Sequence, residues 1–461
     1  ALLPSVLVGE LRRMFPTLAT QVSELSPSLA QAVRPAFELM ALTFREPTVL
    51  SASLKALFAN RPGYRRRLSA LERAADRRPF AFAGRDAAAR LFGNKMILSA
   101  TKIEKYHLCR FAYFCRYGLH AKPRRKAEFN ALEYGTAIHF LLERLLRTHS
   151  PAELGEQPPA SLQREIDELL EEYVTTRLGG WEDKTPRFRY LFSRLSATAR
   201  ALVLQLAAEL CQSEFVPTDF ELAIGEGGDL APMTLRLPGG GEVLVEGKID
   251  RLDVMHKNGK SYVRVVDYKT GTKVFQLSDV LFGLNMQMLL YLITVWQNGK
   301  DRYGDVIPAG ILYMPSQDGP VEAGRHANEA AVKKEKGKQF KMNGLLLDDK
   351  QVIVGMEPGA AGLFIPAKLS KNGELDSRSS VGSLSQFGRL AARMEELLTR
   401  MAQTLREGDV PAVPAAGEYD ACAWCDYKTV CGHERGDPVR WIEKIDRIQV
   451  LEALAEKEVQ P

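Results

Sequence analysis

The stretch VRVVDYKTG, residues 263–271, places an aspartate and a lysine at the end of a run of valines and directly before a turn. β-Branched residues followed by a turn signal predict a buried β-strand. Side chains alternate between the two faces of a strand, so Asp267 and Lys269 project from the same face. Burial of either charge is unfavourable without a partner or a metal ion. The stretch therefore predicts either a salt-bridged strand end or the edge of an active site.

The overall composition restricts the class of protein. The chain has 461 residues, which is more than one ordinary hydrophobic core holds and predicts two or three domains. A hydrophobic content of 45% and a charged content of 26% are typical of a soluble globular protein. No apolar run is long enough to cross a bilayer, so we expect no membrane association. The net charge of +5 is only mildly basic, so any nucleic-acid partner must be argued from local clusters.

The cysteines are too few for a disulfide framework in a chain of this size. Three of them form the cluster CAWCDYKTVC, a spacing that suits ligands of one metal ion or cluster in a reducing compartment. A cytoplasmic location is therefore the default expectation. The six cysteines are Cys109, Cys115, Cys211, Cys422, Cys425 and Cys431.

The hydrophobic pattern predicts three regions. Residues 1–95 show apolar side chains at helical spacing. Residues 96–435 combine amphipathic helices with a strand-rich part, and they include a lysine-rich insertion at about residues 316–350. Residues 436–461 predict a C-terminal helix and tail. The phosphate-binding loop motif GxxxxGK[ST] is absent, so we expect no ATP site in this chain.

The strand-rich part predicts a hairpin that brings two carboxylates together. Residues 241–255, GEVLVEGKIDRLDVM, and residues 261–271 alternate with a period of two and are separated by a turn signal. If these arms pair, Asp250 converges with Asp267 and Lys269. Two close carboxylates repel unless a cation lies between them, and such oxygen ligands suit Mg²⁺ or Mn²⁺. Lys269 could then stabilise a developing oxyanion or hold an attacking water.

Two predicted helices add polar groups at helical spacing. In YGTAIHF, Gly135 and His139 lie one turn apart and share a face, where the imidazole can reach a metal. A lone helical histidine is more often structural. In residues 279–297, DVLFGLNMQMLLYLITVWQ, which predict one helix, Gln287 and Tyr291 also share a face. The alternative for that pair is an ordinary amphipathic helix.

The order of these motifs resembles the nuclease signature of the RecB-type branch of the PD-(D/E)XK superfamily. GxxxH, GxxD, DxK and QxxxY occur in that order, as Gly135–His139, Gly247–Asp250, Asp267–Lys269 and Gln287–Tyr291. A cysteine before this core and three after it, together with KQFKMNGLLLDD in the insertion, resemble the AddB family of bacterial helicase–nuclease subunits. The resemblance covers roughly residues 95–435.

The resemblance implies an α/β fold: a PD-(D/E)XK nuclease core with a mixed central sheet flanked by helices. A helical region, the remnant of a helicase-like region, precedes this core, and a Cys₄ cluster closes it. The implied metal ligands are His139, Asp250, Asp267 and the backbone carbonyl of Tyr268. The implied catalytic residues are Asp250, Asp267, Lys269, Gln287 and Tyr291.

The resemblance also implies a [4Fe–4S] cluster on Cys109, Cys422, Cys425 and Cys431. Spacing alone does not separate this from a structural Zn²⁺ site, since four cysteines serve both. Cys109 lacks the Pro-Phe that commonly follows the first cysteine of the family, and Cys115 is the nearby rival. We expect the cluster to be structural and Cys109 to be its first ligand.

The implied activity is that of a metal-dependent DNA exonuclease that cuts a single strand threaded from a duplex end during double-strand-break repair. The implied partner is an AddA-type helicase–nuclease subunit, and the chain is expected to be a C-terminal fragment of a bacterial protein. The alternative is a non-catalytic DNA-binding or scaffolding module with a structural Cys₄ metal site. Basic residues expected to contact DNA are Lys122, Arg124, Arg125, Lys126, Arg251, Lys333, Lys334, Lys336, Lys338 and Lys341.

Overall fold

The computed structural model divides the chain into two compact units, residues 1–79 and 80–461. The residues that the structure describes are 6–17, 27–75, 82, 84–123, 131–182, 184–269, 275–316, 328, 335, 337–434 and 436–456.

The first unit is helical, as the sequence pattern predicts. Its buried core includes Leu39, Met40 and Phe58, and the rings of Phe37 and Tyr64 each lie 5.0 Å from that of Phe58. Such aromatic contacts give a small unit a large apolar area to bury. Its helices are α1 (Val6–Met14), the short 3₁₀ helix η1 (Pro27–Gln31), α2 (Val33–Leu42), α3 (Val49–Ala59) and α4 (Arg65–Ala75).

The boundary between the units falls at residue 79, whereas the sequence pattern places it at residue 95. The difference is α5 (Arg85–Phe92), which packs against α17 (Leu384–Arg406) of the second unit. Helical periodicity marks α5 as a helix but carries no information about the partner that buries it. The C-terminal residues also belong to this unit, since α19 (Arg447–Glu456) packs against α17.

The second unit is built on a mixed sheet of eight strands among the described residues. The order is β1-β4-β5-β6-β7-β8, and β2 and β3 both pair with β4 as well. The long central strand β4 thus joins two halves of the sheet. The strands are β1 (Lys95–Ser99), β2 (Val216–Ile224), β3 (Met233–Arg236), β4 (Glu242–Lys257), β5 (Lys260–Lys269), β6 (Val306–Pro315), β7 (Asn343–Leu347) and β8 (Val381–Gly382).

The predicted hairpin is confirmed. β4 and β5 pair in antiparallel register with Arg251 opposite Val266 and Lys257 opposite Lys260. The turn between them uses Asn258 and Gly259, both at positive φ, which is the backbone geometry of a tight two-residue hairpin. β6 then pairs in parallel with β5, as expected of a strand reached through a helix.

The predicted insertion at residues 316–350 is too long. Residues 343–347 form β7, which pairs antiparallel with β6 inside the sheet, and Leu345 and Leu346 are fully buried. Lys350 begins helix α16 (Lys350–Met356). The high lysine content masks a short apolar strand, because NGLLL is too brief to show a period of its own.

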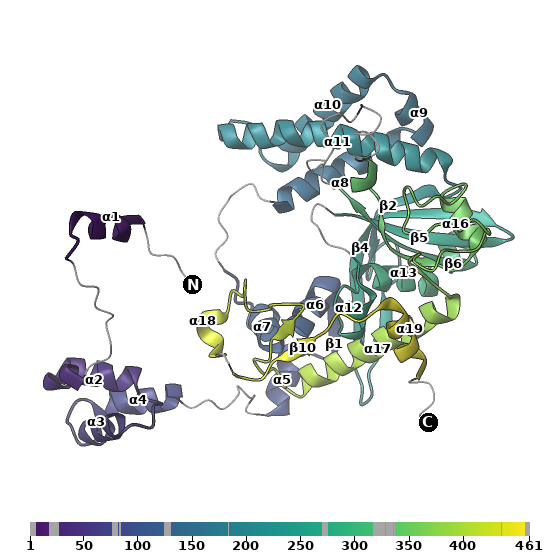
Figure 1. Ribbon diagram of the computed structural model, residues 1–461. Helices are drawn as coiled ribbons and strands as arrows, with labels where there is room; N and C mark the ends of the chain where they lie inside the picture. Colours follow the sequence, from purple (N-terminus) through teal and green to yellow (C-terminus); the bar gives the residue numbers. More distant parts are fainter. Residues whose placement is uncertain are drawn as a thin grey trace. The chain divides into compact units, whose positions relative to one another are not determined.

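Helices cover both faces of this sheet (Figure 1). The group α8 to α11 gathers on one face, and α12, α13 and α17 lie on the other. Strand alternation explains how β5 reaches both layers, since Arg264 bonds to α11 and Asp267 bonds to α13. These helices are α8 (Ala131–Thr148), α9 (Pro151–Glu156), α10 (Pro159–Arg177), α11 (Pro186–Gln212), α12 (Leu277–Leu281) and α13 (Gln287–Asn298).

The single helix predicted over residues 279–297 is wrong. The chain forms α12, then a loop, and then α13 begins at Gln287. Within the loop, Gly283 has φ +76° and Asn285 has φ +52°. Glycine and asparagine are the residues that adopt left-handed backbone most readily, so the loop is encoded locally. Its consequence is that Gln287 stands at the first turn of α13, facing the strand ends.

The remaining elements complete the second unit. The C-terminal segment forms a parallel pair of short strands, β9 and β10. No helix in the described part of the chain is long and apolar enough to cross a membrane. These elements are α6 (Ala100–Leu108), α7 (Arg110–Tyr113), the π-helical turn η2 (Phe114–Gly118), α14 (Lys300–Tyr303), β9 (Ala415–Gly417), α18 (Lys428–Cys431) and β10 (Arg440–Ile442).

Candidate functional site

The two predicted carboxylates lie where β4 changes partner. β4 pairs with β1 up to Glu246 and with β5 from Arg251 onward, so the ladder opens between these points. Asp250 stands in this opening, where its Oδ2 accepts a hydrogen bond of 3.3 Å from the Tyr268 backbone N–H. Asp267 precedes Tyr268 and is buried. The opening therefore holds both carboxylates, as the hairpin register predicts.

His139 reaches the same opening from α8. Its Nε2 lies 2.9 Å from the Tyr268 carbonyl oxygen, and its Nδ1 lies 3.4 Å from Asp250 Oδ1. Burial alone would lower the pKa of His139, but the hydrogen bond and charge of Asp250 outweigh it and raise the pKa to about 9. The imidazole thus sits where a cation is stabilised, which is what a metal ion would require.

A third acidic residue, Glu221 on β2, completes a cluster that the sequence reasoning missed. Its carboxylate, that of Asp250 and a ring nitrogen of His139 all lie within 4.8 Å of one another. Lys248 forms an ion pair with Glu221. Glu221 has φ +54°, an uncommon backbone for a non-glycine residue that is often found at functional sites. No sequence motif marks Glu221, and only the pairing of β2 with β4 shows that it lies beside Asp250.

Asp267 is held from two sides. Lys269 Nζ lies 2.6 Å from Asp267 Oδ2, and Gln287 Nε2 on α13 donates a hydrogen bond of 3.4 Å to Oδ1. Burial, followed by the charge of Asp250, raises the pKa of Asp267 to about 6, against the opposing effect of Lys269. A carboxylate that ionises with difficulty gains most from a nearby cation. A cation close to Asp267 would therefore stabilise its ionised form, as Lys269 does.

Gly247 and Tyr291 explain two further parts of the predicted signature. A Cβ at Gly247 would lie 2.4 Å from the Tyr291 hydroxyl oxygen, so only glycine leaves room for that ring. Tyr291 is buried, and burial raises the pKa of its hydroxyl despite a hydrogen bond from the Lys248 backbone. Gly247 and Tyr291 therefore form one packed unit that joins β4 to α13.

Arg251 is completely buried, so its side chain is not exposed for the DNA contact that the sequence predicts. Its Nε lies 2.8 Å from Asp253, and its Nη1 donates a hydrogen bond of 3.1 Å to the Tyr268 hydroxyl. Arg264 bonds to Asp253 and to Glu209 of α11, each at 2.8 Å. These four charged residues tie α11 to the sheet behind the site. The sequence shows the basic residue but not the distant carboxylate that neutralises it.

The other predicted DNA contacts are placed only in part. Lys122, Lys338 and Lys341 are exposed, and Lys338 forms an ion pair of 2.6 Å with Glu335. Their role stays a prediction. The predicted contacts that lie outside the described residues are Arg124, Arg125, Lys126, Lys333, Lys334 and Lys336.

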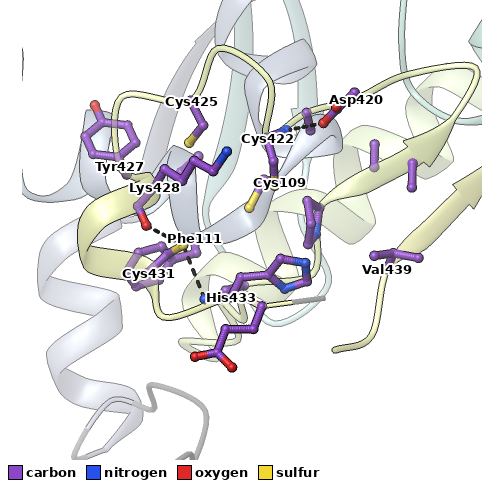
Figure 2. Close-up of a pocket in the computed structure, with 17 residues that line it drawn as sticks. Cys109, Phe111, Asp420, Cys422, Cys425, Tyr427, Lys428, Cys431, His433 and Val439 are labelled. Atoms are coloured by element: carbon purple, nitrogen blue, oxygen red, sulfur yellow. Dashed lines mark hydrogen bonds between the residues drawn. The ribbon is translucent and has the colours of Figure 1, made fainter. Parts of the chain in front are cut away.

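A second candidate site is the cysteine pocket, defined as the pocket that Cys109, Cys422, Cys425 and Cys431 line together (Figure 2). Cys109 comes from the α6–α7 junction and the others from around α18, so the pocket joins segments more than 300 residues apart. Cys115 does not line the pocket and is buried in the main core. This placement supports Cys109 as the first ligand.

The cysteine pocket brings four thiols to one place. Four thiolates serve both a structural Zn²⁺ site and an iron–sulfur cluster, so the lining alone leaves both groups open.

Residues 97–432 match the family model of the PD-(D/E)XK nuclease superfamily. Because this match covers most of the chain and the sheet is the predicted one, the chain belongs to that superfamily, and the predicted fold class is confirmed.

The chain is similar to curated AddB proteins, which carry the name of an ATP-dependent helicase/deoxyribonuclease. The protein of Clostridium acetobutylicum is 32% identical over 352 residues, covering 75% of this chain and 30% of that protein. The protein of Ruminiclostridium cellulolyticum is 29% identical over 452 residues, covering 93% and 39%. The predicted resemblance is thus confirmed, and the chain spans well under half the length of these relatives.

Proposed function

We propose that this chain is a divalent-metal-dependent deoxyribonuclease module that hydrolyses phosphodiester bonds of a single DNA strand. The observation that carries the proposal is the cluster of His139, Glu221 and Asp250 beside the Asp267–Lys269 pair. The word deoxyribonuclease in the names of the similar proteins supports DNA as the substrate. A nuclease superfamily supports hydrolysis as the reaction.

The residues present fit a hard divalent cation, because they offer carboxylate oxygens, a carbonyl oxygen and an imidazole. His139, Asp250, Asp267 and the Tyr268 carbonyl would hold Mg²⁺ or Mn²⁺, with Glu221 as a further oxygen donor. Such an ion, when bound, neutralises a phosphate and lowers the pKa of its water.

The remaining side chains position the reacting groups. Lys269 Nζ, one ion-pair distance from Asp267, can orient the attacking water or stabilise charge on the phosphate oxygens. Gln287 fixes the orientation of Asp267 from α13. Tyr291 fills the space above Gly247 and keeps β4 close to α13. Each of these roles is a positioning or electrostatic role, which is what phosphate hydrolysis chiefly requires.

A labelled-strand assay tests the activity. A single-stranded oligonucleotide carrying a 5′ or 3′ label is incubated with the chain in Mg²⁺, in Mn²⁺ and in EDTA. Shortening of the strand only with the divalent ion supports the nuclease, and the label that survives longer gives the polarity. Binding without cleavage in both metals would instead favour the non-catalytic DNA-binding module.

We further propose that the cysteine pocket holds a structural [4Fe–4S] cluster. The meeting of Cys109, Cys422, Cys425 and Cys431 in one pocket supports it, together with the resemblance of their order to that of the AddB family. A cluster bound to both Cys109 and the segment around Cys422 would cross-link two distant parts of the chain. Closing so long a loop reduces the entropy of the unfolded chain. Loss of Cys109 should therefore loosen the unit rather than affect the metal site directly.

Matched cysteine variants test this assignment. Cys109→Ala should yield colourless protein with a lower unfolding temperature, whereas Cys115→Ala should keep the visible absorption and the iron content. The reverse behaviour would transfer the ligand role to Cys115. Stoichiometric zinc without iron in the purified wild-type chain would exclude the iron–sulfur assignment.

The wider role follows from the relatives. We propose that the chain works as part of a bacterial, cytoplasmic helicase–nuclease, paired with an AddA-type subunit, that processes DNA ends for recombinational repair. The names of the similar proteins, which combine an ATP-dependent helicase with a deoxyribonuclease, support this proposal. Co-purification with an AddA-type subunit and ATP-dependent degradation of linear duplex would test the assembly.

A further inference from the structure

A cavity outside the metal site is lined by four arginines, and we call it the arginine pocket. No acidic residue of the described part of the chain lines it. It lies between α6, α17 and the segments around residues 411–413 and 439–440. Apolar side chains form much of its wall, including Phe282, Leu397 and Met401. The charged and titratable residues that line it are Tyr106, His107, Arg110, Arg393, Arg400 and Arg440.

The arginines outnumber the carboxylates that pair with them. Arg393 and Arg400 both bond to Glu396, and Arg110 bonds to Asp409. Within the described part of the chain, Arg440 donates its hydrogen bonds instead to two backbone carbonyl oxygens. The pocket therefore keeps a net positive charge, and an anion entering it would be attracted.

His107 gives a second indication that the arginine pocket is positively charged. It is buried in this wall, and its Nε2 has no hydrogen-bond partner among the described residues. Burial, and then the positive charges of Arg440 and Arg110, lower the pKa of His107 to about 3. The imidazole is therefore neutral, and the charges of the arginines around it contribute to this. Positive charge thus gathers at this wall of the pocket.

The arginine pocket lies close to the metal site along the chain. Leu281 and Phe282 line the pocket, and Gln287, which bonds to Asp267, follows five residues after Phe282. Five residues span at most about 18 Å even when fully extended. Arg393 and Arg440 bond to the carbonyls of Leu281 and Phe282, so the pocket is fixed to the loop that delivers Gln287.

From these observations we infer that the arginine pocket is a phosphate subsite of the nuclease, which holds the DNA strand a few nucleotides from the bond that is cut. The inference rests on the proposed function, since it assumes a DNA strand at the metal site. The arginines would contact one backbone phosphate, and the apolar wall with Tyr106 would face the adjoining sugar or base. An acidic protein segment is the competing occupant.

Arg400 is the best residue for a test because it is exposed and its ion pair is with Glu396 of its own helix. Arg400→Ala is compared with Arg389→Ala, which lies on the same helix but lines a different cavity. Both are made in an Asp267→Asn background so that binding is measured without cleavage. The probe is a fluorescent oligo-dT, titrated over a range of salt concentrations.

The expected result is five- to tenfold weaker binding for Arg400→Ala at low salt, and a salt slope smaller by about 0.7, the value for one phosphate of a single strand. Arg389→Ala should bind like its parent. Equal affinity and slope for the two variants would overturn the inference. Competition by poly-glutamate, with DNA affinity unchanged in Arg400→Ala, would also overturn it and indicate an acidic protein partner.

A length series in the cleavage-competent chain locates the subsite. Arg400→Ala should raise KM for a long strand without changing kcat, and should leave a dinucleotide unaffected because it is too short to reach the pocket. An equal effect on both lengths would refute the placement. If the Asp267→Asn background itself still cleaves DNA, the proposed metal chemistry fails, and the same binding comparison carried out in EDTA still tests the pocket.

Discussion

Replacement of Arg251 by methionine tests whether this residue is part of the framework or part of the DNA surface. Its side chain is fully buried, with Asp253 at 2.8 Å and Glu209 at 3.7 Å. Removing one member of a buried ion pair leaves the other charge uncompensated, which typically costs about 3–5 kcal/mol. We therefore expect Arg251→Met to destabilise the second unit by about that amount.

The expected change in melting temperature follows from the size of the unit. Residues 80–461 unfold with an entropy of about 0.8 kcal/mol/K near the midpoint, so the loss corresponds to about 4–6 °C. Calorimetry of Arg251→Met and of Lys257→Met measures it. Lys257 lies on the same strand in an ion pair with Glu214, but both side chains are partly exposed, so its loss should cost about 0–1 kcal/mol.

The two outcomes are well separated. A melting temperature for Arg251→Met within about 1 °C of Lys257→Met, together with weaker DNA binding and a smaller salt slope, would refute the framework role. It would restore the role in DNA contact that the sequence alone predicts for this residue.

Three further predictions concern the metal site. Glu221→Gln should weaken Mg²⁺ affinity about tenfold or more while the fold persists, as isothermal titration would measure; unchanged affinity would remove Glu221 from the ligand set. Gly247→Ala should reduce cleavage at least tenfold, because the new Cβ would lie 2.4 Å from the Tyr291 hydroxyl oxygen and would force the ring to move. Cleavage at the wild-type rate would contradict this. With pKa values of about 9 for His139 and about 6 for Asp267, the metal-free site at pH 7.5 carries a proton on His139 but not on Asp267. Mg²⁺ binding should therefore release about one proton, and affinity should rise from pH 6 to 9 and fall more steeply below pH 6. Titrations in buffers of different ionisation enthalpy measure this release, and zero release would count against His139 as a ligand.

The hairpin and its two carboxylates could be predicted because their signal is local. The alternation in β4 and β5 and the turn between them lie within about 30 consecutive residues. Strand geometry then fixes that Asp250 and Asp267 face the same opening. His139, Gln287 and Tyr291 came from the resemblance, since a helix period places them on a face but not against a particular strand.

The parts that sequence missed depend on long-range packing. Glu221 belongs to no motif, and only the pairing of β2 with β4 brings it beside Asp250. Arg251 follows Asp250 directly, and its burial depends on Glu209, which lies 42 residues earlier on a helix. The break before α13 was different, because Gly283 supplies a local signal that the strong apolar periodicity hid.

The most direct test of the central claim is the Mg²⁺ dependence of strand cleavage by the wild-type chain and by Asp267→Asn and Lys269→Ala. We expect wild-type cleavage to rise with Mg²⁺ and to stop in EDTA, Asp267→Asn to be inactive with its fold intact, and Lys269→Ala to bind Mg²⁺ while losing most turnover. Cleavage by either variant at the wild-type rate, or wild-type cleavage that persists in EDTA, would contradict the assigned chemistry.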